Sequence, residues 1–195
     1  MRENGLLARL GLDRPELRAW AMYDWAVSAV QTTVMVAVFP IYFKQVAAAG
    51  VADSTATGYV ATANSVALVV VAVLSPILGA WVDFAGNRKR FLALFMGLGA
   101  TATALMFFVG FGDVRLGYWL FVLALLGASA SFVFYESLLP HIARGEAEMD
   151  RISAAGYGLG YVGGGILLAL NLAWILKPAL FGLPSGPGLT PEQQT

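Results

Sequence analysis

The chain contains no cysteine and one histidine, and both shortages exclude classes of protein. Without cysteine it can form neither a disulfide nor a thiolate metal site. A single histidine, His141, offers little for a metal centre or a catalytic triad. No nucleophile stands beside a base in a recognisable pattern. We therefore expect no enzyme activity, no cofactor and no metal.

Charge is also scarce. Only 12% of the 195 residues are charged, whereas a soluble domain carries about 25%. The formal net charge is zero, and no clustered basic surface is evident, which argues against a nucleic-acid partner. With 58% hydrophobic residues and a mean hydropathy of +0.72, the composition indicates a membrane protein whose partner is lipid.

Five apolar runs are each long enough to cross a bilayer as a helix, which takes about 20 residues. They cover residues 19–43, 58–82, 91–111, 116–139 and 152–176. Because the runs are continuous rather than alternating, they exclude a β-barrel. The predicted fold is an all-α membrane protein with five transmembrane helices.

The distribution of Lys and Arg predicts the orientation of these helices. Nine of the twelve Lys and Arg residues lie on one side, in the N-terminal segment (residues 1–18) and in the loops after the second and fourth spans. The other three lie on the opposite side. We expect residues 1–18 and the charged turn at 83–90 to be cytoplasmic. Residues 177–195, rich in Pro and Gly, are then expected to form an extracytoplasmic loop that leads to a sixth helix missing from this chain.

Polar residues recur on one face of the first span, at positions Asp24, Ser28, Gln31 and Thr32. An ionised carboxylate in hydrocarbon costs at least about 2.5 kcal/mol, so Asp24 should face protein or water. Two readings of Asp24 stay open: a functional group of a pathway, or a side chain that reaches back to the interface. Its protonation state also stays open, because desolvation and nearby cations act on it in opposite directions.

The fourth span carries Glu136 near its cytoplasmic end, at a depth similar to that of Asp24. Two acids at this depth suggest an ion-paired network, or static pairing at the helix ends. The candidate cations are Arg88, Arg90, Arg144 and Arg151.

Glycines recur every four residues in the fifth span, at Gly156, Gly160 and Gly164. This spacing is typical of close helix packing in membranes. A phosphate-binding loop is excluded because the glycines follow no strand, lack a lysine and lie in an apolar span.

The turn after the second span resembles the loop signature of the major facilitator superfamily of transporters. The matching residues are Gly79, Asp83, Gly86, Arg88 and Lys89. Segments 18–29, 134–142 and 150–161 extend the resemblance to the branch that holds the autophagy-related vacuolar amino-acid effluxers and their bacterial relatives. The resemblance covers about residues 18–178.

This resemblance implies twelve helices in two halves and alternating access around a central cavity. The chain would supply the first five helices, with the remaining helices and a small-molecule substrate as partners, in the inner membrane of a bacterium. The signature residues would form the cytoplasmic gating loop. Gln31 and Thr32 would face the substrate, and Asp24 and Glu136 would lie at the cytoplasmic mouth, where Asp24 is a candidate for proton coupling.

A second hypothesis is a complete five-span scaffold or assembly partner without transport activity. The reading frame after Thr195 discriminates between the two hypotheses: a sixth span favours the transporter, and a stop codon favours the scaffold.

Overall fold

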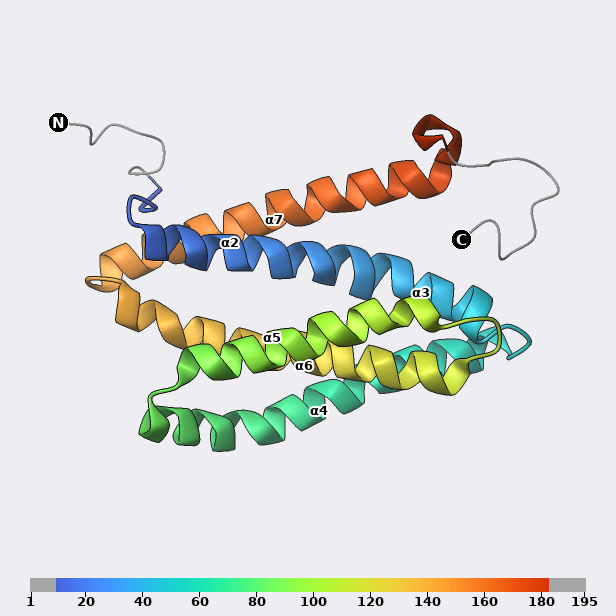
Figure 1. Ribbon diagram of the computed structural model, residues 1–195, viewed down its shortest axis with the longest axis horizontal. Coiled ribbons are helices and arrows are strands. Elements are labelled where there is room, and N and C mark those ends of the chain that lie inside the picture. The colour runs from blue at the N-terminus through green and yellow to red at the C-terminus, as the bar shows by residue number, and fades with distance from the viewer. Residues whose placement is uncertain (1–9, 183–195) are drawn as a thin grey trace.

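The computed structural model describes residues 10–182, without the side chains of Asp83 and Ala85 (Figure 1). All regular structure in this part of the chain is helical, with no strand. Five helical stretches are long and apolar enough to cross a membrane, which confirms the predicted all-α membrane fold. Successive helices run in opposite directions. The start of the first, the second turn and the fourth turn therefore meet at one end of the bundle, here called the Arg88 end (Figure 1).

The first span is continuous but changes its winding. It consists of α2 (Pro15–Val30), η1 (Gln31–Val38), α3 (Phe39–Tyr42) and η2 (Phe43–Ala47), of which η1 and η2 are π-helical. Pro40 has no N–H, and its ring would clash with the carbonyl four residues earlier in a regular α-helix. The wider π turn accommodates this: the Phe39 N–H donates to the carbonyl of Val34, five residues back. π segments are frequent at functional sites.

The remaining spans are single long helices. They are α4 (Asp53–Ala85), α5 (Arg88–Leu105) with the 3-10 turn η3 (Met106–Phe108), α6 (Val114–Ile142), and α7 (Glu146–Leu176), which precedes the 3-10 turn η4 (Pro178–Phe181).

The turn between α4 and α5 is shorter than predicted. The sequence suggested about eight residues, 83–90, but only Gly86 and Asn87 lie between the two helices. Gly86 adopts φ +65°, which favours glycine, and its N–H donates to the carbonyl of Val82 at 2.8 Å. With this C-terminal cap, α4 continues past Asp83 to Ala85.

The third span ends three residues earlier than predicted, at Phe108 rather than at residue 111. A tight turn stops it: the Asp113 carboxylate accepts the Gly110 N–H at 3.0 Å, and Gly112 adopts φ +82°. Apolar residues beyond the helix end therefore belong to the loop.

Helix α6 is central to the bundle, packing against α4, α5 and α2, while α2 lies along α7 (Figure 1). Its contact with α5 depends on two glycines. A Cβ atom on Gly127 would lie 2.4 Å from the backbone nitrogen of Gly99. The two backbones can approach this closely because neither residue has a side chain.

Arg14 connects the start of α2 to the turn between α6 and α7. Its guanidinium donates to the carbonyl of Ile142 at 2.8 Å and to the carboxylate of Glu148 at 3.1 Å. Glu148 also accepts the backbone N–H of Arg144. The link holds α2 beside α7 at the Arg88 end, which positions the site described next.

Candidate functional site

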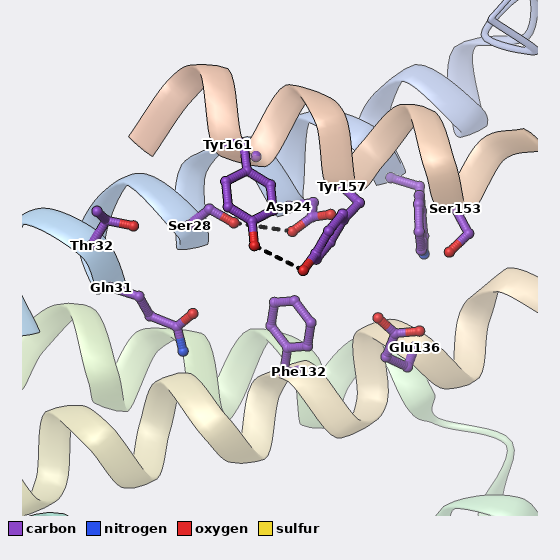
Figure 2. A pocket seen from close by; sticks show the side chains of 11 residues that line it. Asp24, Ser28, Gln31, Thr32, Phe132, Glu136, Ser153, Tyr157 and Tyr161 are labelled. Atoms are coloured by element: carbon purple, nitrogen blue, oxygen red, sulfur yellow. Dashed lines mark hydrogen bonds between the residues drawn. The ribbon is translucent and has the colours of Figure 1, made fainter. Parts of the chain in front are cut away.

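A cavity of about 410 Å³ lies between α2, the first turn of η1, α6 and α7 (Figure 2). It is lined by Trp20, Asp24, Ser28, Gln31, Thr32, Phe132, Glu136, Ser153, Tyr157, Gly160 and Tyr161. The four residues predicted for a substrate or proton pathway, Asp24, Gln31, Thr32 and Glu136, thus line one space.

The polar face of the first span forms one wall of this cavity. Asp24 and Ser28 are one helical turn apart, and the Ser28 hydroxyl donates to Asp24 Oδ1 at 3.2 Å. Gln31 and Thr32 continue the same face at the point where η1 begins. Asp24 is only 6% exposed, so its carboxylate is largely removed from the surroundings of the bundle.

The glycine stripe of α7 provides the space for that carboxylate. A Cβ atom on Gly156 or on Gly160 would lie 3.3 Å from an Asp24 oxygen, and one on Gly164 would lie 3.0 Å from Thr32 Oγ1. The predicted packing stripe therefore lies directly against the predicted polar face of the first span. A larger residue at Gly160 would also meet Ser28 Oγ at 2.7 Å.

The second acid comes from the opposite wall. Glu136 projects from α6 toward the cavity, across from the α2 and α7 side chains (Figure 2). Among the described residues, no ion pair involves Asp24 or Glu136. The predicted network of these acids with arginines is therefore wrong for this part of the chain. One physical reason is placement: the Arg151 side chain lies along Gly11 instead.

Aromatic rings complete the lining, and they were not predicted from the sequence. They belong to Trp20 on α2, Phe132 on α6, and Tyr157 and Tyr161 on α7. The two tyrosine hydroxyls are hydrogen bonded at 2.9 Å, with ring centroids 4.8 Å apart. The available signal was spacing: Tyr157 and Tyr161 are one helical turn apart, as are Phe132 and Glu136.

A buried aromatic stack fixes α2 against α6 beneath the cavity. Trp20 stacks on Tyr135 at 4.4 Å, and Tyr23 stacks on Tyr135 at 4.8 Å. The Trp20 indole N–H also donates to the Tyr135 carbonyl at 3.3 Å, and the Tyr23 hydroxyl donates to Ser131 at 2.7 Å. These contacts set the distance between the walls that carry Asp24 and Glu136.

The predicted gating residues lie apart from the cavity, at the Arg88 end. Gly79 is in α4, Gly86 forms the turn, and Arg88 and Lys89 open α5. None of them lines the cavity. The side chain of Asp83, the fifth predicted gating residue, lies outside the described part of the chain.

No group of three or more His, Asp or Glu side chains suited to a metal ion occurs in the part of the chain described. The chemistry that the cavity offers is instead that of two carboxylates, neutral hydroxyl and amide groups, and aromatic faces. Such a lining can bind a solute and exchange protons.

A polar cavity between membrane-spanning helices is a common feature of membrane transporters. Residues 12–181 match the family described as vacuole effluxer Atg22 like, and the chain belongs to this family. It is also similar to a Bacillus subtilis (strain 168) protein named as an uncharacterised major-facilitator-type transporter, YxiO, with 35% identity over 159 residues. No solved structure matches the chain.

The aligned region covers 81% of this chain but 37% of YxiO. The chain thus spans well under half the length of that relative. The five helices correspond to an N-terminal portion of the major facilitator fold, as the sequence resemblance predicted.

Proposed function

We propose that the protein is a secondary active transporter that moves a small polar solute, such as an amino acid, across the inner membrane of a bacterium. This chain forms its N-terminal part, with the Arg88 end in the cytoplasm. The family match and the transporter relative support the class. The cavity supports the location of the solute pathway, because polar side chains from three different helices line it.

The buried carboxylate of Asp24 carries the proposal of proton coupling. Asp24 is 6% exposed, accepts one hydrogen bond from Ser28, and has no ion pair among the described residues. A buried carboxylate without a counter-ion is costly when ionised. A proton can remove that cost, so a change in access to the cavity can take up or release a proton at Asp24.

The test is Asp24→Asn in the full-length protein reconstituted in vesicles. Asparagine keeps the size and the bond to Ser28 but cannot titrate. We expect gradient-driven accumulation of the solute to disappear, while exchange of labelled solute between the two sides continues at saturating concentration. Normal accumulation by the variant would contradict coupling through Asp24. Absence of transport by the unmodified protein, over a broad solute panel, would instead favour the scaffold hypothesis.

We further propose that the turn between α4 and α5 gates the cytoplasmic side, with Asp83, Arg88 and Lys89 as the latch. The support is placement: these residues flank a two-residue turn at the end of two long helices. Asp83→Asn should lower the transport rate by about tenfold, since a charge-assisted contact contributes about 1.5–3 kcal/mol. Solute affinity should stay within about twofold; a large loss of affinity with an unchanged maximal rate would contradict the latch.

A further inference from the structure

The charged residues that line the cavity are all acidic. Its lining contains two acidic residues, Asp24 and Glu136, and no Lys, Arg or His. Neither acid forms an ion pair within the described part of the chain. An anionic solute entering this space would therefore meet two carboxylates and no compensating cation.

Asp24 is the more buried of the two acids. The carboxylate is more than nine-tenths buried and lines the cavity, and Ser28 supplies its one hydrogen bond from the described residues, to Oδ1. The Oδ2 atom lies beside Gly156, which has no side chain that could donate to it. A ligand with N–H donors and a positive charge would satisfy this oxygen, because charge-assisted hydrogen bonds are about twice as strong as neutral ones.

The walls around the acids are aromatic. Four of the lining side chains are Trp20, Phe132, Tyr157 and Tyr161, from all three helices (Figure 2). A cation near such faces is attracted by the ring quadrupole, by about 0.5–2 kcal/mol per ring depending on desolvation. The hydrogen bond between the two tyrosine hydroxyls fixes these rings relative to each other at the cavity edge.

We propose that the cavity is a subsite for the ammonium group of the transported solute. Asp24 is the main counter-ion, Glu136 is the second, and the aromatic rings form the walls. The substrate class is thus an amine-bearing organic solute whose cationic end binds here. This inference rests on the proposed transport function. It also explains how one carboxylate serves two roles, because a proton and an ammonium group compete for Asp24.

The experiment measures equilibrium binding to the purified full-length protein with three probes of similar size: phenethylammonium, neutral 2-phenylethanol and anionic 3-phenylpropionate. We expect phenethylammonium to bind at least tenfold more tightly than the other two. Asp24→Asn should weaken its binding at least tenfold and Glu136→Gln about threefold. Glu146→Gln, which removes an exposed acid at the start of α7 with no contact to the cavity, should change nothing.

A second pair of variants keeps the test decisive if Asp24→Asn fails to fold. Tyr157 is 63% exposed and belongs to neither buried hydrophobic cluster, so we expect its variants to fold. Tyr157→Phe keeps the ring and should bind phenethylammonium within about twofold of the unmodified protein, whereas Tyr157→Leu should bind it at least threefold more weakly. Equal affinity for the three probes, or equal effects of the two Tyr157 variants, would overturn the subsite.

The two proposals fail separately. Selective, Asp24-dependent binding of phenethylammonium without transport of any amine would leave the subsite standing and refute the transport function. Transport of other solutes, without preferential binding of the cationic probe, would support the transport function and refute the subsite.

Discussion

Asp24 owes its environment to residues that have no side chains. The carboxylate lies between Gly156 and Gly160, each of which would place a Cβ atom 3.3 Å from one of its oxygens. Small residues at this spacing let membrane helices approach closely. Here the same glycines also leave room for a polar group that would otherwise be displaced.

Gly160→Ala tests this dependence. The added methyl group would lie 2.7 Å from Ser28 Oγ, so the hydroxyl must turn away from Asp24 and lose its 3.2 Å hydrogen bond. Loss of a hydrogen bond costs about 0.5–1.5 kcal/mol, and we expect about a threefold to tenfold slower transport. Gly158→Ala is the matched control, because a Cβ atom there has no neighbour within 4 Å. Equal transport rates for the two variants would show that transport does not need the space that Gly160 leaves beside Ser28 and Asp24.

At the scale of helices, α5 and α6 approach each other closely through two glycines. A Cβ atom on Gly127 would lie 2.4 Å and 2.6 Å from backbone atoms of Gly99. Backbone cannot rotate away as a flexible side chain can. The contact therefore holds the two helices at a separation that only glycine allows at this position.

Gly127→Ala should destabilise the protein by about 1–3 kcal/mol, the usual cost of overpacking a well-packed contact. Gly165→Ala, in a helix but with nothing near the added Cβ atom, should be neutral or stabilising by up to about 1 kcal/mol. Thermal unfolding in detergent measures both variants. An unfolding temperature for Gly127→Ala at or above that of Gly165→Ala would mean that α5 and α6 are further apart than described.

At this scale the sequence predicted some features and missed others for identifiable reasons. Continuous apolar runs predicted five helices, and the period of 3.6 residues placed Asp24 and Thr32 on one face. The contact between Gly99 and Gly127 depends on the relative register of two helices. The sequence of a single apolar run holds no information about that register. Whether Tyr157 faces the cavity depends likewise on the orientation of α7 about its own axis relative to α2. The short turn at Gly86 was missed because charged residues suggested a loop where a helix continues.

As a whole molecule, the described bundle combines the polar cavity between α2, α6 and α7 with a largely apolar outside. Large apolar side chains such as Val73, Ile77 and Leu170 are more than half exposed on its surface, as expected for helices that contact lipid or further helices of the same protein. We therefore place the proposed pathway for a polar solute in the cavity between α2, α6 and α7. The proposed function depends on this single assignment.

Two neighbouring threonines of η1 allow the assignment to be tested with a matched control. Thr32 lines the cavity, whereas Thr33, the next residue, is 1% exposed and lies in the packed interior. The chain has no cysteine of its own, so each position can be labelled selectively once any cysteines elsewhere in the full-length protein are replaced. The substitutions are similar in size, and both positions lie in the same helical turn.

The most direct measurement is the rate at which a membrane-impermeant maleimide reacts with Thr32→Cys and with Thr33→Cys in vesicles. We predict that Thr32→Cys reacts at least tenfold faster than Thr33→Cys, and that a transported solute slows the reaction of Thr32→Cys. Equal reaction rates of the two variants, or a reaction of Thr32→Cys that a transported solute leaves unchanged, would show that the solute pathway does not pass through the cavity.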